Sequence, residues 1–161
     1  MMTRQGVVHD TFTIERDYPF PPHKVFRAFA DLETKKRWFR GPAEWRSNVP
    51  HTLDFRVGGA EHEEGGPPEG PVHTMDATYL DIVDNERIIY SYSMTLDGDP
   101  ISVSLATVEL HARGEGTHLA LTEHSAHFET SHYDVSLAAA SRLEGTGELL
   151  DQLGRALTDA V

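Results

Sequence analysis

The chain contains no cysteine, so it can form no disulfide, offers no thiol nucleophile and cannot bind a metal through thiolates. It also lacks long apolar runs. The N-terminus has no stretch of signal-peptide length, and nothing approaches the roughly 20 apolar residues of a membrane span. Basic residues are scarce, with 14 Lys and Arg against 26 Asp and Glu and a net charge of −12. This balance argues against nucleic acid and anionic membranes as partners, and we expect a cytoplasmic protein.

Several signature motifs are missing as well. Ser102 and Ser104 lie in the middle of a strand pattern without a G-x-S-x-G elbow, so a serine hydrolase is not supported. The glycine pairs at 58–59 and 65–66 lack the strand–turn–helix context of a phosphate-binding or dinucleotide-binding loop. We therefore expect no cofactor and no metal. The 161 residues contain 39% hydrophobic residues, which predicts one domain spanning residues 1–161.

The clearest pattern is at the C-terminus, where residues 141–161 predict one amphipathic helix. Gly147 and Gly154 lie a heptad apart beside its apolar stripe, which suggests that something approaches the helix closely. Packing against a sheet is favoured over contact with a ligand. The predicted stripe consists of Leu143, Thr146, Leu149, Leu150, Leu153, Ala156, Leu157 and Ala160.

Nearly all strand-like sequence precedes this helix. Residues 7–18 alternate as a half-buried strand, and two short helices, from Pro22 through Phe29 and over residues 32–39, follow it. Residues 61–71, EHEEGGPPEGP, are expected to form an acidic loop outside the core, and residues 126–135 to be irregular. The other strands are predicted over residues 45–49, 52–57, 73–83, 87–94, 101–111 and 117–125.

This order predicts an α+β fold in which a curved antiparallel sheet of about six to seven strands wraps around the long C-terminal helix. A sheet of this length, with one face covered only by a single helix, must curl around that helix. We expect a cavity between the curled sheet and the helix.

The chain resembles the SRPBCC superfamily, which includes START, birch-pollen-allergen and polyketide-cyclase relatives. More narrowly, it is similar to the C-terminal domain of Aha-type activators of the heat-shock chaperone ATPase. The resemblance implies a helix-grip fold and says little about function, because lipid carriers, cyclases, hormone receptors and co-chaperones share that scaffold. Many relatives carry a bulky Trp where this chain has Thr146, which implies a roomier cavity. The matching segments are residues 21–39, 54–59, 81–94, 101–110, 116–124 and 144–153.

Inward-facing aromatic and apolar residues are candidates to line that cavity, although plain core packing explains most of them equally well. The tyrosines are the most informative, because each hydroxyl needs a partner and ligand pockets combine apolar walls with a few polar groups. The candidates are Trp38, Trp45, Phe55, Tyr79, Tyr90, Tyr92, Met94, Thr146 and Leu150.

Glu123 and His73 are the candidates for acid–base chemistry. Glu123 shares the strand face of Leu119 and Leu121, so it is predicted to point inward, where burial would raise its pKa. The competing interpretation, which we favour, is that Glu123 meets water or pairs with a basic side chain. His73 alternates with Met75 in the same inward sense. Both residues could also serve as hydrogen-bond anchors for a polar group of a ligand.

Three histidines, His124, His127 and His132, cluster before the last helix. The spacing of the first two could hold a metal, but no acidic residue joins them at helical spacing, and solvated loop histidines are the favoured interpretation. The segment of residues 127–132, HFETSH, is also more polar than the resemblance implies, and it is expected near the cavity mouth.

Three functions remain in order of preference. The first is binding of a small hydrophobic or aromatic molecule. The second is a cyclase, dehydratase or hydrolase that uses Glu123 with His73 or a tyrosine. The third is a chaperone-associated stress protein, which rests on the resemblance alone; a chaperone partner is not expected, because full-length activators carry a second, N-terminal domain. A homodimer is left open.

Overall fold

The computed structural model describes residues 6–130 and 133–160 and contains seven strands and three helices in these ranges. The strands form one antiparallel sheet in the order β1-β7-β6-β5-β4-β3-β2. The elements are β1 (Val7–Tyr18), α1 (Pro22–Ala30), α2 (Leu32–Lys35), β2 (Thr52–Leu53), β3 (Ala60–Gly65), β4 (His73–Val83), β5 (Arg87–Leu96), β6 (Asp99–Arg113), β7 (Gly116–Phe128) and α3 (Ala138–Asp159).

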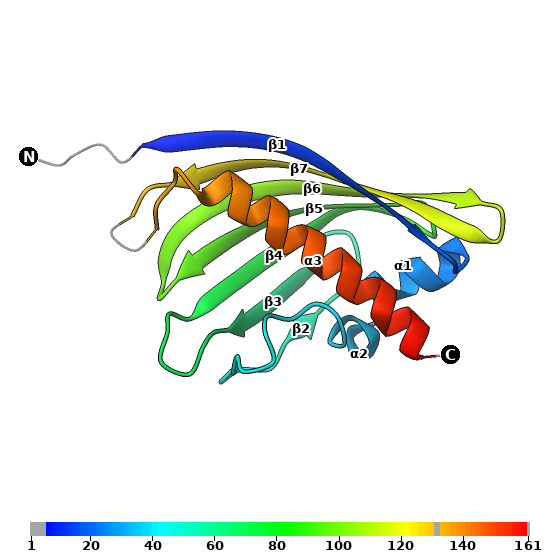
Figure 1. Ribbon diagram of the computed structural model, residues 1–161, viewed down its shortest axis with the longest axis horizontal. Helices are drawn as coiled ribbons and strands as arrows, with labels where there is room; N and C mark the ends of the chain where they lie inside the picture. The colour runs from blue at the N-terminus through cyan, green and yellow to red at the C-terminus, as the bar shows by residue number, and fades with distance from the viewer. Residues whose placement is uncertain (1–5, 131–132, 161) are drawn as a thin grey trace, which may run out of the picture.

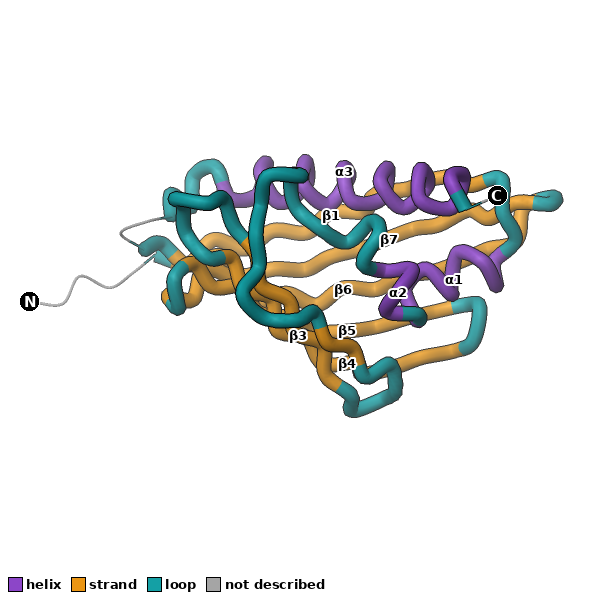
Figure 2. The backbone as a smooth tube through the Cα atoms, turned by 90° about the horizontal axis from the view of Figure 1, so that it is seen from below, coloured by secondary structure: helices purple, strands orange, loops and turns teal. Residues whose placement is uncertain are grey.

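The sheet is curved, and α3 lies along its concave face (Figure 1). The short helices α1 and α2 lie at the end of the sheet where α3 finishes (Figure 2). This arrangement confirms the predicted α+β helix-grip fold, with two short helices after the first strand and a long C-terminal helix.

Tight turns set the order of the four consecutive strands β4 to β7. Strands β4 to β7 follow one another as hairpins, and their turns contain residues in the left-handed region, Asn85 (φ 64°), Gly98 (φ 84°) and Gly114 (φ 61°). Such residues match the twist of antiparallel hairpins. β1 then pairs with β7 along its whole length, from Val7 opposite Phe128 to Tyr18 opposite Thr117.

Proline and aspartate begin the two short helices as expected. Pro22 occupies the first turn of α1, and the Asp31 carboxylate accepts a hydrogen bond from the backbone N–H of Thr34 to cap α2. The second helix is shorter than predicted and ends at Lys35, with turns continuing toward Phe39. Trp38 folds back from these turns and donates from Nε1 to the Ala28 carbonyl at 2.9 Å.

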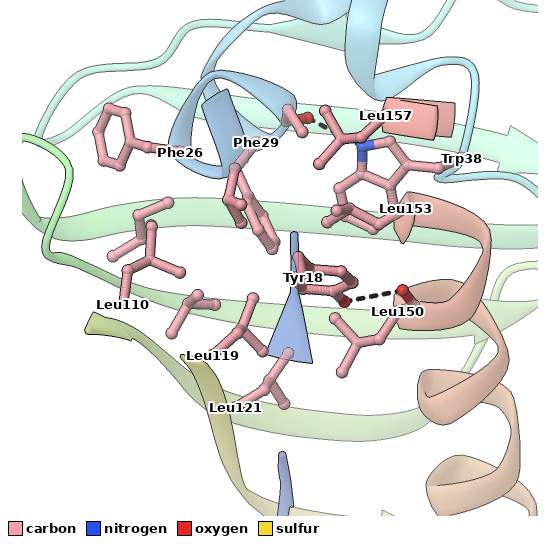
Figure 3. Close-up of a cluster of buried hydrophobic side chains, with 14 of the residues drawn as sticks. Tyr18, Phe26, Phe29, Trp38, Leu110, Leu119, Leu121, Leu150, Leu153 and Leu157 are labelled. Atoms are coloured by element: carbon pink, nitrogen blue, oxygen red, sulfur yellow. Dashed lines mark hydrogen bonds between the residues drawn. The ribbon is translucent and has the colours of Figure 1, made fainter. Parts of the chain in front are cut away.

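The hydrophobic core lies beneath the C-terminal half of α3 (Figure 3). Leu153 and Leu119 are fully buried where the helix meets the sheet. Tyr18, at the end of β1, donates its hydroxyl to the Leu150 carbonyl at 2.8 Å and so ties the first strand to the last helix. The helix and the sheet are therefore in direct contact at this end.

The two helix glycines lie against side chains of β1. A Cβ on Gly154 would lie 3.1 Å from Tyr18 Cε1, and one on Gly147 would lie 3.3 Å from Arg16 Nη2. The close approach that the glycines predicted is therefore made by the sheet. Leu143 and Ala160 depart from the predicted stripe, because 44% of the surface of Leu143 is exposed and Ala160 is exposed as well.

The structure corrects several local predictions. Of the strand expected over residues 52–57, only Thr52–Leu53 forms β2. The expected acidic loop contains β3, in which Glu61 is only 2% exposed. Residues 45–49 form no strand; Arg46 makes one isolated bridge to Gly66. Strand β7 continues to Phe128, into the segment expected to be irregular. The sequence pattern missed β3 and the end of β7 because both contain charged and polar residues, and the burial of such residues depends on partners from distant elements.

Alanine substitutions at two α3 glycines should differ in their effect on stability. Gly145→Ala should raise the free energy of unfolding by about 0.5–1 kcal/mol, because its Cβ meets nothing within 4 Å and alanine favours the helix. Gly154→Ala should lack this gain, because the added Cβ crowds the Tyr18 ring, which is held by its bond to Leu150. Urea unfolding measures both, and equal stabilisation would show that the ring yields freely.

Candidate functional site

A cavity of about 850 Å³ lies beneath the N-terminal half of α3. Its floor is the inner face of β4, β5 and β7, and one wall is formed by α2 and the segment up to Ser47. The lining is mostly apolar or aromatic and includes Phe29, Trp38, Phe39, Trp45, Met75, Tyr90, Met94, Leu96, Ile101, Leu121, Leu149 and Leu150. The core therefore fills only one half of the space between helix and sheet.

Arg142 brings a positive charge from α3 into this apolar space. Its guanidinium donates from Nη1 to the Tyr92 hydroxyl at 2.9 Å and to Ser104 Oγ at 3.1 Å, and from Nη2 to Ser102 Oγ at 2.7 Å. Both serines lie on the inner face of β6 and are buried. Three hydroxyls thus replace water around the charge, which lowers the cost of burying it.

Glu123 from β7 completes this polar end of the cavity. It is 2% exposed, and the Tyr92 hydroxyl donates to its Oε1. Its Oε2 lies 3.6 Å from Arg142 Nη1 and accepts no hydrogen bond from any described residue. Burial raises the pKa of Glu123, and the Arg142 charge and the Tyr92 hydrogen bond oppose this rise.

The predicted inward orientation of Glu123 is therefore correct, and its side chain is not exposed to water. The basic neighbour of the competing interpretation is also present, in Arg142. The two are close, but Glu123 keeps one oxygen without a hydrogen bond. A carboxyl group in this setting can orient a polar group, and its raised pKa is suited to proton transfer.

A second polar cluster lies behind the opposite wall, centred on Glu61 of β3. Lys35 Nζ donates to Glu61 Oε1 at 2.7 Å, the Tyr79 hydroxyl donates to the same oxygen at 2.5 Å, and His51 Nε2 lies 2.6 Å from Oε2. Burial alone would raise the pKa of Glu61, but Lys35 and these hydrogen bonds outweigh it and lower that pKa to about 2.

This cluster joins three parts of the chain that form the cavity wall. Lys35 comes from α2, His51 precedes β2, and Glu61 and Tyr79 lie on β3 and β4. Each Glu61 oxygen already has a partner, so Glu61 holds α2 and the following segment in position.

His73 lies at the start of β4 and stacks on Trp45 with ring centroids 4.5 Å apart. Burial lowers the pKa of His73, which favours its neutral form. Both rings line the cavity, but His73 makes no hydrogen bond with Glu123 among the described contacts. The two acid–base candidates share the cavity without forming a pair.

Most of the predicted lining residues reach the cavity. Phe55 does not, because its ring packs in the core against Phe26 and Tyr79 at centroid distances of 5.6 and 5.0 Å. Tyr79 is 1% exposed and uses its hydroxyl on Glu61. The expectation that Phe55 and Tyr79 line the cavity was therefore wrong. The predicted residues that line the cavity are Trp38, Trp45, His73, Tyr90, Tyr92, Met94, Glu123, Thr146 and Leu150.

The histidines before α3 are not solvated loop residues. His124 and His127 both lie in β7, and the odd spacing of three places them on opposite faces of the sheet. His124 is exposed beside Thr11, whereas His127 is fully buried and lies 2.9 Å from Ser125 Oγ. They cannot share a metal ion. His132 lies outside the described residues.

Sequence analysis missed several polar residues of this region. Arg142 precedes Thr146 by four residues and Leu149 by seven, so helical spacing alone could have placed it on the cavity face. Lys35, Glu61 and Glu63 had no such signal, because their local patterns are those of exposed charged residues.

The whole architecture has relatives. The model of the family described as "Activator of Hsp90 ATPase homolog 1-like protein" matches residues 19–158. The chain belongs to this family. This confirms the resemblance to the SRPBCC superfamily, whose members bind hydrophobic ligands or act as polyketide cyclases. No match was found among curated proteins. Within the described ranges, no helix has the length and apolarity needed to cross a membrane.

Solved structures of similar proteins share this fold. The Mll3558 protein from Rhizobium loti is 43% identical, with 94% of this chain and 99% of that chain covered and a TM-score of 0.82. A protein from Rhizobium leguminosarum is 39% identical, with coverages of 98% and 99% and a TM-score of 0.87. CalU16 from Micromonospora echinospora is 20% identical, with coverages of 98% and 87% and a TM-score of 0.60, and shares the fold.

Breaking the buried Lys35–Glu61 pair should destabilise the protein strongly. Lys35→Met should lower the free energy of unfolding by about 3–5 kcal/mol, because it leaves the buried Glu61 carboxylate without its cation. Adding Glu61→Leu to this variant should recover part of the loss, since the unpaired charge is removed. Urea unfolding measures both variants.

The matched control is the exposed Lys36–Glu33 pair, at 3.3 Å. Lys36→Met should change stability by no more than about 1 kcal/mol, as is typical of surface pairs. A double variant at Lys35 and Glu61 that is less stable than Lys35→Met alone would contradict the assignment of the pair.

Proposed function

We propose that this protein binds a small hydrophobic or aromatic molecule in the cavity between the curved sheet and α3. The observation that carries the proposal is a space of about 850 Å³ with mostly apolar walls and a buried polar cluster of Arg142, Tyr92 and Glu123 at one end. Ligand sites characteristically combine such a volume with a few well-placed polar groups.

The walls supply affinity, because each apolar Å² removed from water contributes about 25 cal/mol. The aromatic rings of Trp38, Tyr90 and Trp45 offer flat surfaces for an aromatic ligand. The polar end supplies orientation. Arg142 Nη1 lies 3.6 Å from Glu123 Oε2, so the guanidinium already faces a carboxyl group, which favours a neutral polar group of the ligand over a fully charged one at this end.

Filling the cavity from α3 should abolish binding without disturbing the core. Thr146→Trp places a large ring into the cavity, and it should weaken binding of biphenyl-4-ol, used as the probe, at least tenfold in titration calorimetry. Leu143→Trp, on the exposed face of the same helix, is the matched control and should bind the probe as the unmodified protein does.

The proposal fails if neither biphenyl-4-ol nor a broad panel of apolar and aromatic metabolites binds or raises the melting temperature. Native mass spectrometry of protein taken directly from cells provides an independent check. A bound ligand would appear as added mass in the unmodified protein, and this added mass should be absent from Thr146→Trp.

A second candidate function, acid–base catalysis in the same cavity, is favoured by the environment of Glu123. Its pKa is raised by burial, and its Oε2 has no hydrogen-bond partner among the described residues. The Arg142 guanidinium, which lies beside Glu123 at the polar end of the cavity, could stabilise the negative charge of a developing oxyanion. A carboxyl group in the position of Glu123 is suited to removing a proton next to a carbonyl of the substrate, as in cyclisation or dehydration.

Glu123→Gln separates catalysis from binding. The amide keeps the shape of the side chain and an acceptor oxygen for Tyr92 but cannot take up the proton, so exchange of α-protons of aryl ketone probes in D₂O should fall by about 100-fold or more. NMR measures the exchange, and calorimetry should give similar probe affinity. Exchange at an unchanged rate in the variant would rule out Glu123 as the base.

The third hypothesis, association with a chaperone, has no support beyond the family resemblance. No contact or surface feature described above points to such a partner, and it is not proposed.

A further inference from the structure

Glu63 is a carboxyl group that neither the core nor the polar end of the cavity uses. It lies two residues after Glu61 on β3, so its side chain is on the same inner face, and it lines the cavity. It accepts no hydrogen bond from any residue of 6–130 or 133–160. The nearby cations do not pair with it, because Lys35 and His51 are both bonded to Glu61.

The register of the sheet places Glu63 across the cavity from Arg142. Glu63 pairs with Met75, Met75 with Met94, and Met94 with Ser102, to which Arg142 donates at 2.7 Å. Three strand spacings separate Glu63 from Ser102, which on a concave sheet corresponds to roughly 10–14 Å. The floor between the two polar points is formed by Met75 and Met94, which both line the cavity.

We propose that Glu63 is a second anchor of the ligand and accepts a hydrogen bond from a hydroxyl or amino group at the end remote from Arg142. This inference rests on the proposed binding function and specifies its ligand class. The ligand has an apolar, preferably aromatic, body with a polar group at each end. An amphiphile with a plain hydrocarbon tail would leave the Glu63 carboxyl buried against methylenes without a partner, which is unfavourable.

The state of Glu63 makes this anchor sensitive to pH. Burial raises the pKa of Glu63 to about 7, with Glu61 adding to the rise and His51 and Lys35 opposing it. An ionised carboxylate accepts a stronger hydrogen bond than a neutral one. A ligand that donates to Glu63 therefore binds more tightly as the pH rises through 7.

Three matched probes test the inference: biphenyl, biphenyl-4-ol and biphenyl-4,4′-diol. The last carries hydroxyls at both ends of one rigid body, with a separation close to the expected span. The diol should bind about tenfold more tightly than the mono-ol, the range typical of a hydrogen bond to a charged group. Glu63→Met, which keeps the side-chain length but removes the acceptor, should abolish this advantage, so that the diol and the mono-ol bind this variant with similar affinity.

The pH arm uses Glu63→Gln. In the unmodified protein the advantage of the diol over the mono-ol should grow several-fold between pH 6 and pH 8, and in Glu63→Gln it should be constant. His51, His73, Lys35 and Glu61 are charged or titratable side chains near this wall, so the mono-ol, measured at each pH, removes their general effect. Glu115→Met, in the exposed turn between β6 and β7, controls for loss of one negative charge.

The outcomes separate the two proposals. If the mono-ol binds and the diol binds no better, or if the advantage of the diol persists in Glu63→Met, the role of Glu63 is wrong and the binding function stands. If none of the three probes binds the unmodified protein and no other apolar or aromatic compound does, the binding function itself fails and the role of Glu63 fails with it.

Discussion

The structure depends on the mismatch in width between one helix and a seven-stranded sheet. Strands spaced about 4.8 Å apart form a surface close to 30 Å across, whereas an α-helix with its side chains is only about 10 Å wide. Curvature of the sheet reduces the mismatch but does not remove it. Where Tyr18 bonds to Leu150 and the leucines of α3 meet the sheet, the two layers are in contact. Farther along, they separate around the cavity.

The polar groups inside this protein follow from that geometry. A carboxyl group buried among side chains must find partners, and Glu61 does so with Lys35, His51 and Tyr79, which lowers its pKa to about 2. Glu123 and Glu63 face the cavity instead, and burial raises the pKa of each. Three inward carboxyls on one sheet thus have different chemistry, and what differs is whether protein atoms or open volume lie opposite them.

Much of the fold could be predicted from the sequence, and the failures have a common physical origin. Strict alternation located the long strands and the inward side of Glu123, because one face of each strand is covered by apolar neighbours. β3 was missed because Glu61, His62 and Glu63 carry charge, and local pattern cannot tell a solvated charge from a paired one. Arg142 was missed for the same reason, although its helical spacing marked the correct face.

The sequence by itself determined most of the element order and a curved sheet around a terminal helix, because these depend on periodicity and turn residues that act over a few positions. The family followed from the resemblance of whole segments to known relatives. Only the tertiary structure decided which polar side chains meet. Arg142 and Ser102 are 40 residues apart, Lys35 and Glu61 are 26 apart, and no local rule relates them. Contacts of this kind depend on the register of the sheet and on the tilt of the helix across it, which are set by the packing of the whole chain.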